Sequence, residues 1–356
     1  MKYCLILSNI YLHTKIKKHR YTQKECYPPL KCGPNNLQIT QRPSSQLKDF
    51  LKNHYFSKVL PHQQSIIGDN FFTTLEWTTN ENNDDCIFVN QVFDYFKFSI
   101  FLNNPHSILP NKLALYTDSK ENTNAEKAWH HLYYNSMIST DAYEELVKND
   151  MLSTTPYLSL SQIDLKNIFN HYNNLHSYYK FCSKNSKNSF YKLNLALTRL
   201  TGNSINSINF HELDCTYFIL DSVIALEALF GDRKSEGVVD KLINRSAIFL
   251  GDQDLNLQSK VKSLFIEIYK IRSKIIHGSI KRTTFFDGDF TQYKEYFKNG
   301  YDELNNPFYD FIKLLADIII KIINTNFKLT EPSLNMLYKS NFLKELKCLD
   351  QKHSSY

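Results

Sequence analysis

The chain has 356 residues, 42% of them hydrophobic, so it can bury more than one core and two domains are expected. Its 9 Gly and 10 Pro, beside 25 Phe and 23 Tyr, exclude a fibrous or disordered protein. The formal net charge of +6 permits a polyanionic partner but is far below that of a dedicated nucleic-acid coat protein.

The first part of the chain, to about residue 150, has the pattern of a strand-containing mixed domain. The apolar run Met1–Leu12 lacks a small-residue cleavage site, so a first β-strand is expected there rather than a secretion signal. The β-branched and aromatic runs Phe71–Thr79 and Cys86–Asn90 predict two more strands, and Ala125–Met137 predicts a short helix. The pattern does not identify the fold of this domain.

Neither the cysteines nor the histidines of the chain predict a metal site. The seven cysteines are odd in number and scattered, and no pair has the two-residue spacing of a zinc or redox motif, so a reduced cytoplasmic protein is expected. His130 and His131 are neighbours that point about 100° apart on a helix, with only Glu126 one turn away, and we interpret them as surface residues. We expect no metal and no other cofactor.

Helical periodicity replaces the strand pattern from about Leu158. Ser161–Asn170 and Phe190–Arg199 predict the first helices of an all-α domain over residues 158–330, with a C-terminal helical or tail extension over 331–356. The polar run Cys182–Ser189 predicts an exposed loop between those two helices. The predicted class is therefore α+β.

The most apolar stretch of the helical part, Leu314–Ile323, is too short to cross a membrane. It is also interrupted by Asp317 and Lys321. We therefore expect no membrane insertion.

One helix near the end of this domain has two different faces. Apolar residues at alternating steps of three and four predict a stripe that faces the core: Val261, Leu264, Ile268, Ile271 and Ile275. Tyr269, Ser273 and His277 fall on a second stripe roughly opposite, with Arg272 on the border. Gly278 predicts a left-handed C-cap, which places His277 in the last turn, where the helix dipole helps to hold a proton on imidazole. The alternative interpretation is a solvated face that ends in a capping histidine.

The segment Arg272–His277 matches the signature of HEPN domains, an arginine and a histidine separated by four residues. The whole string Tyr269–Gly278 resembles the Apea-like branch of that superfamily. Three further segments resemble the same branch in the same order, and the resemblance covers roughly Leu158 to Asn326: Tyr191–Leu200, Leu220–Phe230 and Asn244–Gly251.

This resemblance implies a bundle of four or five helices that forms a homodimer, in which two motif helices meet at one composite cleft. It also implies RNA cleavage without metal, leaving a 2′,3′-cyclic phosphate and a 5′-hydroxyl. His277 would act as general base or acid, since imidazole titrates near pH ~6.5, and Arg272 would bind the scissile phosphate. Apea-like relatives are associated with phage resistance, so a defence or toxin effector is expected, with an N-terminal sensor or regulatory domain. Candidate substrates include tRNA anticodon loops.

Several other residues have both a functional and a structural interpretation. Glu227, in an otherwise apolar segment, is expected to form a structural ion pair with Arg245 or to orient Arg272 or His277. Tyr269 is expected to stack on a base or to pack against the partner helix. Four cations in or just after the motif helix are candidates for binding flanking phosphates, although solvated side chains explain them equally well: Lys270, Lys274, Lys281 and Arg282.

Ser273 departs from the pattern of many active HEPN nucleases, which have Asn, Asp or His after the motif arginine. The leading hypothesis, from the resemblance, is a metal-independent endoribonuclease. Because of Ser273, the alternative is a non-catalytic HEPN module for dimerisation or RNA binding. A third hypothesis, a helical scaffold in which His277 is only a cap, predicts a monomer without affinity for RNA.

Overall fold

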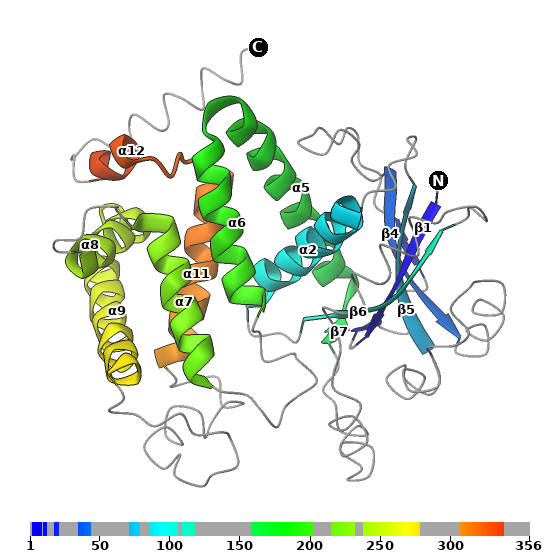
Figure 1. The fold of residues 1–356 in the computed structure, drawn as a ribbon, viewed down its shortest axis with the longest axis horizontal. Coiled ribbons are helices and arrows are strands. Elements are labelled where there is room, and N and C mark those ends of the chain that lie inside the picture. Colours follow the sequence, from blue (N-terminus) through cyan, green and yellow to red (C-terminus); the bar gives the residue numbers. More distant parts are fainter. Residues whose placement is uncertain are drawn as a thin grey trace, which may run out of the picture. The chain divides into compact units, whose positions relative to one another are not determined.

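The structure is a computed structural model that describes residues 2–8, 10–12, 18–20, 35–43, 71–78, 86–105, 109–117, 158–202, 215–231, 238–277 and 307–337 (Figure 1). The described strands are β1 (Lys2–Ser8), β2 (Ile10–Leu12), β3 (Lys18–Arg20), β4 (Asn35–Pro43), β5 (Phe71–Thr78), β6 (Asn111–Thr117) and β7 (Leu158–Leu160). The described helices are α2 (Cys86–Asn103), α5 (Gln162–Asn185), α6 (Lys187–Gly202), α7 (Cys215–Phe230), α8 (Val238–Gly251), α9 (Leu255–Ile276), α11 (Pro307–Asn324) and α12 (Glu331–Met336). This helix-rich arrangement confirms the predicted α+β class.

The chain divides into two compact units, and the division falls within α5, after His176. The first unit contains the strands, α2 and the start of α5, and the second contains the rest of α5 and the helices α6 to α12. The domain limits expected from the sequence stay predictions, because residues 118–157 lie outside the described part of the chain.

Five strands of the first unit form an antiparallel sheet in the order β3-β4-β5-β1-β6, and β2 pairs with β7 in parallel. In the centre of the sheet Leu5 lies opposite Leu75 on one side and Leu115 on the other. Leu5 and Leu7 of β1 are buried, and so are five consecutive residues of β5, Thr73 to Trp77, so both faces of β5 are buried. The strands predicted within Met1–Leu12 and over Phe71–Thr79 are thereby confirmed.

The strand predicted over Cys86–Asn90 is wrong, because these residues begin the helix α2. A short apolar run does not distinguish a buried strand from the first turns of a buried helix. The continuation of α2 to Asn103 buries Tyr95 and Phe96, which pack on the start of α5: the Tyr95 and His176 ring centroids are 5.0 Å apart, and those of Phe96 and Phe169 are 6.3 Å apart.

The second unit is a helical bundle. Each of α7, α8, α9 and α11 contacts the other three, and α6 packs along α7 (Figure 1). Aromatic pairs fill the interior, such as Phe265 and Phe311, whose ring centroids are 5.1 Å apart, and Phe230 and Phe249 at 5.6 Å. Among the described residues, no helix combines the length and the apolar character that a membrane span requires.

The exposed loop predicted over Cys182–Ser189 is also wrong in most of its length. The helix α5 continues to Asn185 and α6 begins at Lys187, so Ser186 alone separates them. Cys182 and Ser189 are buried. Polar composition was misleading here, because the serine and asparagine residues lie on helices whose other faces pack inside the unit.

Candidate functional site

The helix α9 carries the motif residues, and its start is fixed by a side-chain cap. Oδ1 of Asp254 accepts hydrogen bonds from the backbone N–H groups of Asn256 and Leu257, both at 3.0 Å. The predicted apolar stripe is confirmed by four buried residues, with Ile275 half-buried: Val261, Leu264, Ile268 and Ile271. The opposite face is therefore the one that α9 presents away from the core.

The outward position predicted for Tyr269 is wrong, because its side chain is only 8% exposed. The hydroxyl donates a hydrogen bond of 3.4 Å to Oε1 of Glu227 on α7. Burial raises the pKa of the Tyr269 phenol well above its usual range, the negative charge of Glu227 adds to this effect, and the positive charge of Arg272 opposes it. The buried face of α9 is wider than one apolar stripe because α7 packs against its side, and Tyr269 belongs to that side.

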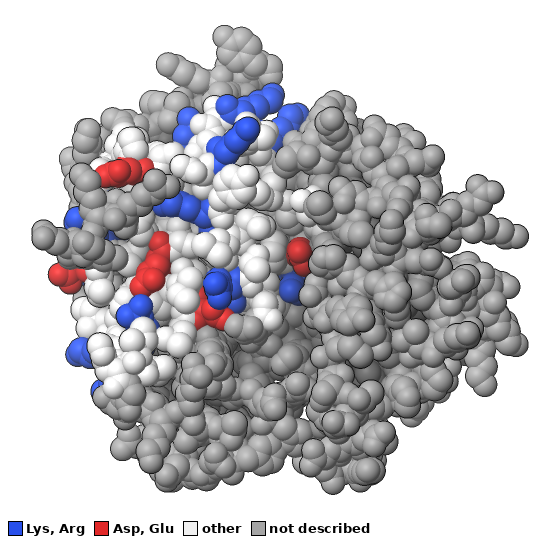
Figure 2. All heavy atoms as spheres, viewed as in Figure 1, with Lys and Arg blue, Asp and Glu red and all other residues white. Residues whose placement is uncertain are grey.

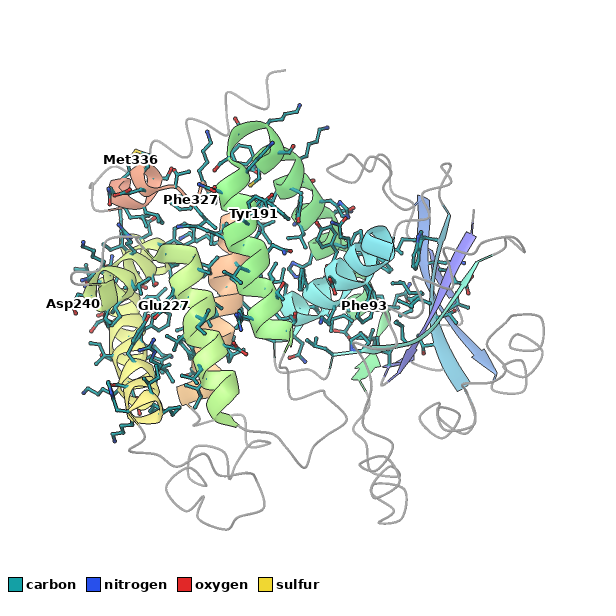
Figure 3. All side chains as sticks on the ribbon, in the orientation of Figure 1. Phe93, Tyr191, Glu227, Asp240, Phe327 and Met336 are labelled. Carbon is teal, nitrogen blue, oxygen red and sulfur yellow. The ribbon has the colours of Figure 1, made fainter. Side chains whose placement is uncertain are left out.

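Arg272 faces the same helix. Its Nη2 lies 3.8 Å from Oε1 of Glu227, and each of the two side chains is 33% exposed. Figure 3 shows Glu227 on α7 beside α9. A pair that is one-third solvated contributes at most about 1 kcal/mol to stability. Its importance is positional, because Glu227 sets where the guanidinium lies while a third of it stays open to solvent.

The structural interpretation of Glu227, an ion pair with Arg245, is wrong. Arg245 does not form the ion pair with Glu227 that the sequence suggested; it is 1% exposed and donates to the carbonyl of Phe230 at 2.7 Å and to Asn335 Oδ1 at 2.9 Å. The ion pair that the structure places on Glu227 is with Arg272.

His277 is the C-cap residue of α9, with φ −84° and ψ 10°, and its backbone N–H donates to the carbonyl of Ser273 at 3.0 Å. The imidazole is exposed, as are the side chains of Ser273 and Lys274. Five residues at about 100° each place His277 about 140° around the axis from Arg272. Ideal helical geometry therefore directs the Cα–Cβ bonds of the two motif residues away from each other.

Several other predicted site residues lie outside the part of the chain that the structure describes. Lys281 and Arg282 are outside the described residues, as are Gly278, the Ala125–Met137 segment and its two histidines. Among the residues that the structure describes, no group of three His, Cys, Asp or Glu side chains has the arrangement of a metal site.

No family model, curated protein or solved structure matches the chain. The resemblance to HEPN domains therefore rests on the sequence segments named above, and the site on the geometry of α7 and α9. The site consists of the Arg272 guanidinium, which is one-third exposed, the Glu227 carboxylate that pairs with it, and the exposed His277 imidazole at the end of the same helix.

The sequence carried a signal for the contact that the outward placement of Tyr269 missed. Phe265, Tyr269, Arg272 and Ile276 recur at steps of four, three and four, which is the spacing of a second helix face. The composition of this face did not predict burial, because a tyrosine and an arginine are commonly exposed. They are covered here because Glu227 on α7 faces them.

Proposed function

We propose that the protein is a metal-independent endoribonuclease of the HEPN type. The observation that carries the proposal is the Arg272 guanidinium, held 3.8 Å from Glu227 yet one-third exposed on the helix that ends in the exposed His277. A guanidinium of this kind can bind two oxygens of one phosphate, and an exposed imidazole can transfer protons.

In this proposal the ribose 2′-hydroxyl attacks the adjacent phosphorus, a new P–O bond closes the 2′,3′-cyclic phosphate, and the bond to the 5′-oxygen breaks. The 2′-hydroxyl loses a proton and the departing 5′-oxygen gains one. The His277 imidazole carries out one of these two transfers and solvent water the other, and no oxidant or reductant is needed. Arg272 stabilises the negative charge that grows on the two free phosphate oxygens.

The divergence of Arg272 and His277 supports a site built from two copies. Ideal helical geometry separates the Cα–Cβ bonds of the two residues by about 140°. In this proposal a phosphate held by Arg272 of one copy is served by His277 of the other when two α9 helices meet about a two-fold axis. The dimer is thus part of the proposed active site.

Glu227 and Tyr269 act in this proposal as positioning residues. The Tyr269 hydroxyl holds the carboxylate, and the carboxylate holds the guanidinium. Neither group needs to touch the RNA.

The test is cleavage of total RNA in EDTA by the wild type and by the Arg272→Ala, His277→Ala and Lys260→Ala variants. Lys260 is an exposed cation of α9, about 18 Å along the axis from Arg272 at ~1.5 Å per residue, so it serves as the control. We expect cutting by the wild type and by Lys260→Ala, fragments that end in a 2′,3′-cyclic phosphate, and a loss of about a hundredfold or more in both motif variants. Cutting that persists in both motif variants would overturn the proposal.

A second candidate is a non-catalytic HEPN module that dimerises or binds RNA. The observation that favours it is the same ion pair, since a guanidinium paired with Glu227 has part of its charge compensated before any phosphate arrives. Ser273, exposed beside it, is the residue at which the motif departs from many active nucleases. RNA binding without cleavage, unchanged by His277→Ala, would establish this function instead.

We further propose that the nuclease is an effector of antiviral defence or a toxin, with tRNA among its substrates and the N-terminal part sensing a trigger. The sequence resemblance to the Apea-like branch supports this role. Expression in a bacterial host, with and without phage infection, tests it through the appearance of cut tRNA.

A further inference from the structure

The stretch between Asp164 and Glu212 contains no acidic residue. Its six cations are Lys166, Lys180, Lys184, Lys187, Lys192 and Arg199. Since the whole chain has 36 acidic residues against 42 Lys and Arg, this separation of charge is local rather than a general property of the sequence. The stretch includes the part of α5 after Asp164 and all of α6.

Three of these lysines gather where α5 meets α6. Lys180 and Lys184 lie one turn apart on α5, and Lys187 follows the single-residue break at Ser186. Lys184 and Lys187 are exposed and Lys180 is half-exposed. Figure 2 shows Lys and Arg side chains gathered at the end of the molecule where Figure 1 places this junction.

A fourth lysine, distant along the chain, lies at the same junction. The Nζ of Lys328 lies 5.7 Å from the ring centroid of Phe181, which is on α5 between Lys180 and Lys184. The backbone on both sides of Lys328 is fixed: Tyr178 donates to the Phe327 carbonyl at 2.8 Å, and Leu329 N–H donates to Ser189 Oγ at 2.9 Å. Lys328 is therefore held at this junction by buried hydrogen bonds.

Hydrogen bonds also connect the two helices at the junction. Ser186 N–H donates to the Cys182 carbonyl at 2.8 Å, and the hydroxyls of Ser189 and Ser186 are 2.7 Å apart. A preformed arrangement of cations costs less conformational entropy on binding than lysines on a loop would cost. The nearest carboxylate along the chain from Lys328 is that of the exposed Glu331.

An exposed aromatic ring lies beside the lysines. Tyr191 is 66% exposed and lies one turn after Lys187, on the same face of α6 (Figure 3). Cations that follow a phosphate backbone next to an aromatic face on which a base can stack are the usual composition of surfaces that bind single-stranded nucleic acid.

We infer that this surface, formed by Lys180, Lys184, Lys187, Tyr191 and Lys328 and called here the α5–α6 corner, binds the backbone of single-stranded RNA away from the proposed catalytic residues. The inference rests on the proposed function only for the choice of RNA as the polyanion. An anionic membrane fits less well, because the buried apolar side of α6, with Leu193, Leu197 and Leu200, is already used inside the unit.

The experiment measures binding of a fluorescent 2′-O-methylated single-stranded RNA to the full chain by anisotropy over a range of salt concentrations. Such an RNA has no free 2′-hydroxyl and cannot be cut by the proposed reaction. The test variant is Lys184→Glu/Lys187→Glu, and the matched control is Lys260→Glu/Lys313→Glu, which makes the same change in net charge at exposed positions of α9 and α11.

We expect the corner variant to weaken binding by about tenfold or more and to reduce the slope of log K against log salt by about 2, one for each lost phosphate contact, whereas the control changes the affinity by less than about twofold. Tyr191→Ala should weaken binding by about fivefold or more with the salt slope unchanged, and Tyr191→Phe should restore it. Equal affinity of the corner and control variants, at unchanged salt slope, would overturn the inference.

Two further results decide whether the corner binds RNA or a membrane, and whether it depends on the nuclease. Binding of the wild type to phosphatidylserine vesicles but not to RNA, with loss of that binding in the corner variant, would assign the surface to a membrane and overturn the inference. If the wild type cuts no RNA but the corner variant loses RNA binding, the corner inference is upheld and the nuclease proposal is refuted. If the wild type cuts RNA and the corner variant binds RNA as tightly as the wild type, the nuclease proposal is upheld and the corner inference is refuted.

Discussion

Glu227 on α7 and Arg272 on α9 approach to 3.8 Å, and Tyr269 reaches the same carboxylate oxygen from one turn earlier on α9. The two helices thus share a polar contact at the edge of an otherwise apolar interface. In the proposed nuclease this contact fixes the direction of the guanidinium before RNA arrives.

Replacing Glu227 with Gln should slow RNA cleavage by about ten- to a hundredfold, because an amide no longer holds the guanidinium by charge. Binding of uncut RNA should stay equal or become tighter, since a negative charge beside the phosphate site is removed. Single-turnover rates and anisotropy measure the two quantities separately. Asp310→Asn, the same change of charge at an exposed position of α11, serves as the control and should leave both unchanged. A purely structural Glu227 would instead lower both in proportion to the folded fraction.

Mixing the inactive Arg272→Ala and His277→Ala variants should restore part of the RNA cleavage activity. If each phosphate is served by Arg272 of one copy and His277 of the other, a mixed dimer of Arg272→Ala and His277→Ala has one intact site of two. Equal mixing makes half of the dimers mixed, so about a quarter of wild-type activity is expected after exchange of subunits. Activity no higher than that of the separate variants would show that both residues act from the same chain or that no dimer forms.

The sequence predicted elements best where one pattern governed a whole segment. The strand over Phe71–Thr79 was predicted from its β-branched and aromatic residues, and the stripe from Val261 to Ile271 from its helical spacing, which reports directly on burial. The strand prediction over Cys86–Asn90 failed because a run of four apolar residues fits both a strand and a helix. The helix continues to Asn103 and packs Tyr95 on His176.

The candidate site was predictable in its residues but not in its pairings. Glu227 had two arginines as possible partners in the sequence, and nothing in their spacing decided between Arg245 and Arg272. Tertiary packing determines the pairing. Arg245 donates to the carbonyl of Phe230 at the end of α7, and Glu227 pairs with Arg272. Spacing alone likewise could not show that α7 covers Tyr269.

Gly231 should not tolerate a side chain. A Cβ at this position would lie 2.2 Å from the carbonyl oxygen of Glu227, which already accepts the Gly231 N–H at 2.7 Å, so the backbone after α7 would have to shift. We expect Gly231→Ala to lower the free energy of unfolding by about 2 kcal/mol or more. Gly202→Ala, where nothing lies within 4 Å of the added carbon, should change it by less than about 1 kcal/mol. Urea unfolding of both variants checks the prediction, and equal stabilities would contradict the backbone geometry at Gly231.

The stability of the fold should fall in mild acid because of His176. This side chain is 5% exposed between the rings of Tyr95 and Tyr172, and burial lowers its pKa to about 4. Since the unfolded chain takes up the proton near pH ~6.5 and the folded chain does not, the unfolded state gains protons first as the pH drops. Between pH 7.5 and pH 5 the free energy of unfolding should therefore decrease by about 2 kcal/mol on account of this group.

The variant that isolates this effect is His176→Phe, which keeps an aromatic ring of similar shape and cannot be protonated. Its stability should depend less on pH than that of the wild type over the same range, as measured by urea unfolding at a series of pH values. His171 is half-buried and its pKa is also lowered by burial, so part of the dependence remains in His176→Phe and should disappear when both are replaced. If His176→Phe follows the same pH curve as the wild type, His176 is accessible to protons in the folded state and its burial between the two tyrosines is not maintained.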